Sequence, residues 1–266
     1  MIGGLVLVVV LYLVLWPTKV EPAAWPNEDA PALEGVYAPN DALTKGTAIV
    51  LGDGPEDMAV GPDGRFYTGM RDGRILRLDA DGTNVETFAH TGGRPLGLAF
   101  DEGGVLWIAD ARKGVLKASA AGEISVGVNE VLGTELRFAD ELAFAKDGTL
   151  WISEASRRWD VEDTVLDVME NQATGRLLHH DPRDGTTVIA LDGLRFANGI
   201  AIAPDQSFVL VSETFAYRVT RLWLTGPKAG THDTYVERLP GFPDNIDLDA
   251  DGTLWVALPS RRSGLL

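Results

Sequence analysis

A short sequence pattern recurs five times along the chain: two apolar residues, a turn containing Asp and Gly, and an apolar strand that usually holds an aromatic residue. The copies are AVGPDGRFYTG from Ala59, AFDEGGVLWIAD from Ala99, AFAKDGTLWISE from Ala143, AIAPDQSFVLVSE from Ala201 and DLDADGTLWVAL from Asp247. Strands joined by Asp-Gly turns indicate β-hairpins. The aligned turn positions are 40, 44, 58 and 46 residues apart, namely Gly64, Gly104, Gly148, Gln206 and Gly252.

A repeat of about 40–50 residues, with room for four strands, is typical of β-propeller blades. A β-solenoid and a β-sandwich are the alternatives. Solenoid repeats are usually shorter, and a sandwich requires no repeated sequence. We therefore predict an all-β chain built as a β-propeller of four-stranded antiparallel blades.

The first residues differ from the rest, because Ile2 to Trp16 contains no charged or strongly polar side chain. Its 15 residues lie between a signal-peptide core of about 7–15 and a membrane span of about 20. We predict that residues 1–17 form an uncleaved membrane anchor. A cleaved export signal and a buried core helix are the alternatives. Residues 18–46, rich in Pro, Ala and acidic side chains, are predicted to form an extended stalk, and residues 47–266 the propeller.

Charge and cysteine content exclude several functions. Lys and Arg number 23 against 39 Asp and Glu, so the formal net charge is −16. Such a chain has no basic surface for phosphate backbones, and we expect no nucleic-acid partner. The absence of cysteine excludes disulfides, thiol catalysis and Cys-ligated zinc.

The spacing of 58 residues marks an insertion in the third repeat, over residues 157–174. Val165, Val168 and Met169 follow helical i, i+3, i+4 spacing, so we predict a short amphipathic helix. The insertion could cover the mouth of the propeller channel or decorate its rim.

One register of the repeat carries oxygen-bearing side chains. Counting back eight residues from each turn position gives Glu56, Leu96, Asp140, Asn198 and Asp244. The first strand of a blade lines the central channel, so these positions should face one another. Crowded carboxylates there need a cation, and oxygen ligands without His or Cys suit calcium. The alternative is that they cap the starts of strands through local backbone hydrogen bonds.

Other candidates are weaker. His179 and His180 are adjacent in a strand and point to opposite faces, which favours a surface role. Ser153 and Ser212 lack the Gly-x-Ser-x-Gly turn of a serine hydrolase. The segment Arg157, Arg158 and Trp159 could contact a ligand at the channel mouth or be solvated.

Several motifs resemble the strictosidine synthase-like branch of the six-bladed calcium propellers, a branch that includes the adipocyte plasma membrane-associated proteins. They are GPEDMAV, GGRPLGLAF, FADELAFAKDGTLWISEASRRW, TVLDVMENQATGRLL, FANGIAIAPDQSFVLVSET, RVTRLWLTGPKAG and LPGFPDNIDL, which cover residues 47–260. The wider clan contains gluconolactonases, paraoxonases and diisopropyl fluorophosphatase, which are calcium-dependent hydrolases. The resemblance implies that calcium is held by Glu56, Asp140, Asn198 and Asp244, although many relatives carry Asn in place of Asp140.

The resemblance also implies six blades, whereas the repeats account for about four blades and the start of a fifth. We therefore expect a chain truncated at its C-terminal end. The catalytic Glu of the plant synthases lies in the sixth blade, so no residue here can be assigned that role.

The leading hypothesis is a membrane-anchored, extracytoplasmic, calcium-dependent hydrolase of lactones or aryl esters, with Asp244 as nucleophile or general base as well as ligand. Its substrate would be a small ester or lactone, and its N-terminal helix would hold it to the membrane. One alternative is the amine–aldehyde condensation that gives the family its name. Another is a propeller that binds a ligand or a protein without catalysis.

Overall fold

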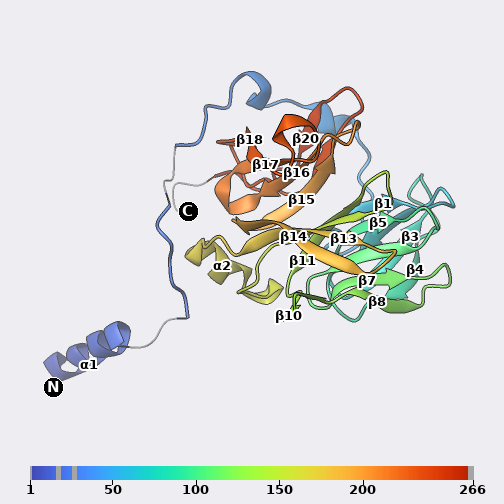
Figure 1. Cartoon of the computed structure of the whole chain (residues 1–266). Coiled ribbons are helices and arrows are strands. Elements are labelled where there is room, and N and C mark those ends of the chain that lie inside the picture. Colours follow the sequence, from blue (N-terminus) through green and yellow to red (C-terminus); the bar gives the residue numbers. More distant parts are fainter. Residues whose placement is uncertain (1, 16–18, 26–28, 263–266) are drawn as a thin grey trace.

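The computed structural model describes residues 2–15, 19–25 and 29–262 and shows four consecutive four-stranded antiparallel sheets followed by a two-stranded one (Figure 1). Residues 1, 16–18, 26–28 and 263–266, which belong to the predicted anchor, stalk and propeller, lie outside the described residues. The first two sheets are β1 (Met58–Val60), β2 (Phe66–Gly69), β3 (Arg74–Leu78) and β4 (Glu86–His90), then β5 (Pro95–Phe100), β6 (Leu106–Asp110), β7 (Gly114–Ala118) and β8 (Ile124–Val128).

The third and fourth sheets are β11 (Ala139–Phe144), β12 (Leu150–Glu154), β13 (Gly175–Asp181) and β14 (Thr186–Leu194), then β15 (Ala197–Ile202), β16 (Phe208–Glu213), β17 (Arg218–Trp223) and β18 (His232–Val236). The two-stranded fifth sheet is β19 (Ile246–Leu248) and β20 (Leu254–Val256), and a small hairpin, β9 (Glu130–Val131) and β10 (Thr134–Glu135), links the second sheet to the third. Each sheet runs in chain order, and the first strands of consecutive sheets contact one another, β1 with β5, β5 with β11, β11 with β15 and β15 with β19. This is the arrangement of propeller blades around a channel, as the repeat predicts.

The repeated turn has a local physical cause. In four of the five first hairpins an Asp Oδ1 accepts the backbone N–H two residues later, namely in Asp63, Asp147, Asp205 and Asp251. The aligned turn position has a positive φ in every copy, which favours glycine, and Gln206 adopts it as well with a φ of 60°. The pattern that defines the repeat is therefore the chemistry of one hairpin turn.

The aromatic residue of each repeat occupies an equivalent place. Trp107 pairs with Ala99, Trp151 with Ala143, and Trp255 with Asp247. Apolar layers fill the space between successive sheets: one lies between the first and second, and the next ones include Trp107 and Trp151. Burial of these layers drives the stacking of the sheets.

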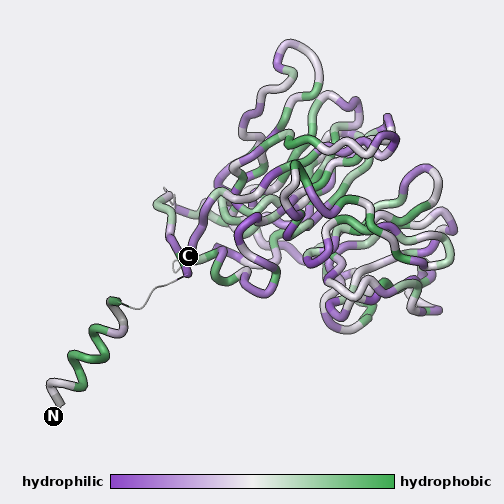
Figure 2. Tube along the Cα trace, turned by 60° about the horizontal axis from the view of Figure 1, so that its bottom comes forward, coloured by the Kyte–Doolittle hydropathy of each residue, from purple (hydrophilic) through white to green (hydrophobic). Residues whose placement is uncertain are grey.

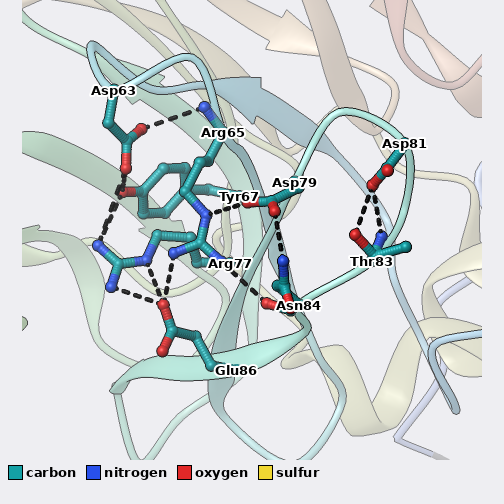
Figure 3. Close-up of polar contacts among 9 residues, drawn as sticks. All are labelled: Asp63, Arg65, Tyr67, Arg77, Asp79, Asp81, Thr83, Asn84 and Glu86. Carbon is teal, nitrogen blue, oxygen red and sulfur yellow. Dashed lines mark hydrogen bonds and ion pairs between the residues drawn. The ribbon is translucent and has the colours of Figure 1, made fainter.

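A polar network closes the first sheet at the end that carries its β1–β2 turn (Figure 3). Glu86 Oε1 accepts hydrogen bonds from Arg65 Nη1 at 2.5 Å and from Arg77 Nη2 at 2.7 Å. Asp63 Oδ2 accepts a bond from the Tyr67 hydroxyl at 3.1 Å, and Arg65 Nε lies 2.9 Å from Asp79 Oδ1. Because most of these groups are partly exposed, the network mainly orders the turns and adds little to stability.

The helices lie outside the sheets. They are α1 (Ile2–Leu15) and α2 (Thr164–Glu170), and single 3₁₀ turns are η1 (Gly35–Tyr37), η2 (Ala42–Lys45), η3 (Val161–Asp163), η4 (Thr214–Ala216) and η5 (Gly226–Lys228). Figure 1 shows α1 set apart from the sheets, and Figure 2 shows that it is predominantly hydrophobic. Among the described residues, no helix has both the length and the apolar character needed to cross a membrane.

The predicted helix in the insertion is present as α2, but its apolar residues do not share one buried face. Val168 packs inward, whereas Val165 and Met169 are 70% and 58% exposed. The buried side of α2 instead carries Asp167 and Glu170. The apolar spacing failed as a guide because hydrogen bonds to the buried Glu170 set the rotation of the helix.

The inner strands approach one another most closely at two glycines, Gly97 and Gly199. A Cβ on Gly199 would lie 2.6 Å from the Cα of Asn245 and 2.7 Å from the carbonyl oxygen of Asp244 in the next sheet. A Cβ on Gly97 would lie 2.8 Å from the Cα of Glu141. Side chains at these positions would push neighbouring sheets apart.

We predict that Gly199→Ala lowers the free energy of unfolding by about 1–3 kcal/mol, the usual cost of overpacking, as measured by urea denaturation. The control is Gly46→Ala in the exposed stalk, whose added Cβ would meet the Leu43 carbonyl oxygen at an ordinary 3.4 Å. It should leave stability unchanged or slightly raised. Equal stability of the two variants would contradict the close packing of inner strands.

Candidate metal centre

The four predicted site residues all lie at the beginnings of inner strands, where the backbone is irregular. Asp140 and its neighbour Glu141 form a bulge in β11, because Ala139 pairs with Glu154 but Leu142 pairs with Ile152. β15 has the same bulge at Asn198 and Gly199, and β5 has it at Leu96 and Gly97. Glu56 lies two residues before the start of β1, and Asp244 lies two residues before the start of β19. A bulge redirects side chains and is common next to functional sites.

Hydrogen bonds from the second strands hold this irregular backbone in place. A carboxylate at the end of the second strand accepts the N–H of a residue two or three positions before each bulge, in the pairs Asp110–Arg94, Glu154–Arg137 and Glu213–Arg195. Serine hydroxyl groups hold the backbone at the site. Ser153 Oγ accepts a hydrogen bond from the N–H of Glu141, the neighbour of Asp140, at 2.9 Å, and Ser212 Oγ donates to the Asp244 carbonyl at 2.8 Å. These bonds explain why Ser153 and Ser212 are buried, and neither serine is paired with a histidine in these bonds.

The structure brings the three carboxylates into electrostatic contact. Asp140 is almost fully buried, and burial together with the charges of Glu56 and Asp244 raises its pKa well above the ordinary value. Burial, followed by the charges of Asp244 and Asp57, raises the pKa of Glu56 to about 8. Burial also raises the pKa of Asp244. Three carboxyl groups that each oppose the ionisation of another are poorly stabilised without a positive charge between them.

Two of the predicted ligands have an oxygen atom without a hydrogen-bond partner. Glu56 Oε2 and Asn198 Oδ1 are both buried and unpaired, and so is Oδ1 of Asn245, the residue after Asp244. Asn198 directs its Nδ2 to Asp244 Oδ1 at 2.6 Å, which leaves its carbonyl oxygen free. Unpaired buried oxygens call for an explanation, and a missing ion is one of the usual ones.

These residues fit a hard divalent cation. They offer carboxylate and amide oxygens, which calcium prefers, and they include no His or Cys for zinc. Within the part of the chain that the structure describes, no three acidic or histidine side chains stand close enough to form a ready-made metal cluster. The fit therefore rests on the unpaired oxygens, the buried charge and the donor chemistry.

A cavity of about 600 Å³ adjoins the site along the inner strands. It is lined by the residues that directly follow three site positions, Asp57, Glu141 and Asn245, and by apolar residues that include Leu98 and Leu142. Asp247 and Trp255 of the fifth sheet also line it, so the cavity has a mixed polar and apolar wall.

Sequence reasoning missed an apolar cluster at the same end of the sheets. Phe138, Phe196 and Phe242 each stand two residues before a site position and pack with Phe215 and Leu96. Phe138 and Phe196 meet edge to face with ring centroids 5.4 Å apart. The signal was present, because counting back ten residues from three of the turn positions finds these phenylalanines.

Arg94 is a second residue that sequence reasoning missed. Its positive charge partly offsets the rise in the pKa of both Glu56 and Asp140. Its Nη1 donates to the Gly54 carbonyl at 2.8 Å. It stands two residues before Leu96, in the blade that contributes no oxygen to the site. Counting back ten residues from Gly104 finds it at the register of the three phenylalanines, but that register does not indicate that its charge acts on Glu56 and Asp140.

The weaker candidates have structural partners. His179 stacks on Trp151, and His180 bonds to the Thr187 hydroxyl at 2.9 Å. In the insertion, Arg157 binds Asp192, while Arg158 Nε and Trp159 Nε1 both lie 2.6 Å from Glu170 Oε2. The basic pair is therefore engaged in ion pairs at this end of the molecule.

Two family models and several curated proteins match the sequence of this chain. The family model described as strictosidine synthase matches residues 130–227, and the one described as strictosidine synthase-like, N-terminal, matches residues 35–78. Protein STRICTOSIDINE SYNTHASE-LIKE 10 of Arabidopsis thaliana is 36% identical over 86% of this chain and 69% of its own length. An adipocyte plasma membrane-associated protein of Danio rerio is 32% identical over 98% of this chain and 67% of its own length.

Solved structures share the fold at low identity. A gluconolactonase from Xanthomonas campestris superposes with a TM-score of 0.64 at 21% identity, over 76% of this chain and 69% of its own. A calcium-binding regucalcin from Agrobacterium tumefaciens does so with a TM-score of 0.59 at 19% identity, over 80% and 68%.

We predict that chelation destabilises the protein and that calcium restores it. A ligand at 100 times its Kd stabilises a fold by about 2.7 kcal/mol, which corresponds to a Tm shift of about 5–10 °C for a domain of this size. Asp140→Asn keeps the shape but removes a charge, so the calcium-induced shift should shrink. Differential scanning fluorimetry in EGTA and in calcium measures both effects.

The matched control is Leu96→Ala, at the same register in the blade without an oxygen ligand. It should lower Tm in every buffer, because about 2–5 kcal/mol of core packing is lost, yet keep the full calcium shift. If the unmodified chain has the same Tm in EGTA and in calcium, a metal role for these residues is ruled out.

Proposed function

The chain belongs to the strictosidine synthase-like family, and from its buried site we propose that it is a calcium-dependent hydrolase of lactones or aryl esters. The observation that carries the proposal is the electrostatic contact of Glu56, Asp140 and Asp244, with the unpaired Asn198 oxygen, next to a cavity lined by the residues that follow three of these positions. The structural neighbours include a gluconolactonase and a calcium-binding regucalcin, which supports both the reaction class and the ion.

In this proposal Glu56, Asp140, Asn198 and Asp244 hold the calcium, with their buried oxygens as ligands. Bound calcium supplies a Lewis acid that polarises the substrate carbonyl. Asp244 acts as nucleophile or as general base for water, and Asn198 Nδ2 orients its carboxylate through the 2.6 Å hydrogen bond. Burial makes Asp244 more basic than a solvated carboxylate, which favours proton acceptance.

The apolar cluster at the site end supports an aryl or alkyl substrate. Phe138, Phe196 and Phe215 are buried, Phe196 meets Phe138 edge to face and Phe215 at a tilt, and Phe242 packs against them. Aromatic side chains exclude water and offer edge-to-face contacts to a substrate ring. The cluster favours an uncharged ester over a polar sugar derivative.

We further propose that α1 anchors the protein to a membrane and that the sheets form part of a six-bladed ring on the extracytoplasmic side. The helix is apolar on every side, with residues from Leu5 to Tyr12 all exposed. An isolated helix of this kind gains from burial in lipid. The relatives named as plasma membrane-associated proteins support the same location.

The test is hydrolysis of phenyl acetate and of δ-valerolactone by the purified chain, in calcium and in EGTA. Activity should require calcium, and Asp244→Asn should reduce kcat by about 10²–10⁴-fold, the usual contribution of a general base. The matched control is Asp251→Asn, the same substitution in the exposed turn of the fifth sheet, where an Asn oxygen can still accept the Thr253 N–H. This control should keep full activity.

Activity that persists in EGTA or in Asp244→Asn would contradict the proposed hydrolase. If both esters stay intact, mass spectrometry of an amine and an aldehyde incubated with the protein would reveal the condensing activity instead. Calcium binding without either reaction would favour the non-catalytic propeller.

A further inference from the structure

Helix α2 exposes two of its apolar side chains and buries both of its acidic ones. Val165 and Met169, one turn apart, are 70% and 58% exposed, whereas Asp167 and Glu170 are 2% and 0% exposed. A surface helix of a soluble protein normally shows the opposite arrangement. Burial raises the pKa of Asp167 to about 6, so the inward placement of this carboxyl group carries a cost.

Hydrogen bonds to Glu170 prevent α2 from rolling its apolar side inward. The two oxygens of this buried carboxylate bind Trp159 Nε1 and Arg158 Nε, both at 2.6 Å, and the backbone N–H of Glu21 at 2.7 Å. Breaking them would leave a buried charge unpaired, which costs several kcal/mol. The outward apolar side is therefore built into the structure.

A second exposed apolar side chain stands at the same end of the molecule. Leu132, at the tip of the β9–β10 hairpin, is 81% exposed and has a φ of 53°, a conformation that leucine rarely adopts. The hairpin connects the end of β8 to the start of β11, and α2 follows the end of β12. Because Ala139 at the start of β11 pairs with Glu154 at the end of β12, the hairpin, α2 and the metal centre share one end of the sheets.

The stalk ties this end to the N-terminal helix. Arg158 Nη2 donates to the Lys19 carbonyl at 3.0 Å, and the N–H of Ala23 donates to the Glu170 carbonyl at 2.8 Å. Only three residues separate Lys19 from Leu15, the last residue of α1. A chain extends at most about 3.5 Å per residue, so the end of α1 lies within about 14 Å of Lys19.

We propose that the site end of the propeller rests on the membrane that holds α1, with Val165, Met169 and Leu132 in the lipid headgroup layer. The inference rests on the proposed anchoring by α1. The inference follows because the short segment between Leu15 and Lys19 keeps the end of α1 close to this end of the sheets, and because α2 exposes two apolar side chains there. Interfacial helices of this kind bury their apolar side about 5–10 Å into the headgroup boundary.

The charges at this end indicate that the contact is apolar and does not select anionic lipid. The arginines around α2 already have acidic partners, in the pairs Arg112–Glu162, Arg137–Asp160 and Arg157–Asp192. Paired arginines add little attraction to a negative surface. Zwitterionic phosphatidylcholine is therefore the expected partner, and salt should have little effect.

The absence of cysteine from the chain allows a direct test with single labels. Val165→Cys, Met169→Cys and Leu132→Cys, each carrying an environment-sensitive fluorophore, are incorporated as full chains into phosphatidylcholine liposomes. The control is Val85→Cys, a valine 47% exposed in the β3–β4 connection, which lies at the opposite end of the first sheet. We expect blue-shifted emission and quenching by spin-labelled lipid at the three test positions, and water-like emission at position 85.

Flotation of the liposomes separates this inference from the anchoring on which it rests. If the chains float but positions 165 and 169 behave like position 85, the anchoring stands and the membrane-facing site end is wrong. If the chains do not float, the anchoring itself is wrong and the inference falls with it. A blue shift that appears only with phosphatidylglycerol and disappears in salt would also overturn the apolar contact.

Discussion

The close approach of inner strands around the propeller axis determines where every functional group of this protein lies. Gly97 and Gly199 have no side chain, so the backbones of the next sheets, at Asp140 and at Asp244, can come within contact distance. The same closeness forces the site side chains together and removes them from water. Buried carboxylates that lie close together resist ionisation when no positive charge is near them. The packing that makes the fold compact thus also creates the demand for a cation.

The irregular strand starts at the site are stable because the regular parts of the sheets hold them. Each bulge lies opposite a second strand whose terminal carboxylate, as in Glu154 or Glu213, accepts a backbone N–H from the segment before the bulge. Apolar layers between the sheets fix those second strands in turn. Strain and unpaired oxygens can persist at a functional site only when the surrounding structure determines them in this way.

The sequence predicted the sheets, and it placed the candidate site residues at the starts of inner strands, because both depend on local chemistry at a fixed spacing. The Asp-Gly turn marks the same position in each repeat, and counting back a fixed number of residues from it leads to Asp140 and Asn198. The rotation of α2 could not be predicted, since it depends on hydrogen bonds between Glu170 and residues as distant in sequence as Glu21. The role of Arg94 was hidden for the same reason, because its charge acts across sheets.

The two apolar features at the site end belong to one continuous structure. Val168, on the inner side of α2, packs against the cluster that contains Phe138 and Phe215, while Val165 and Met169 on its outer side face away from the protein. The width of α2 therefore separates this buried cluster from the proposed lipid contact. An uncharged ester dissolved in the bilayer would meet apolar groups on both sides of α2, whereas a charged molecule would lose its hydration there. On this argument, the inverted helix and the phenylalanine cluster select the same class of substrate that the metal centre is proposed to hydrolyse.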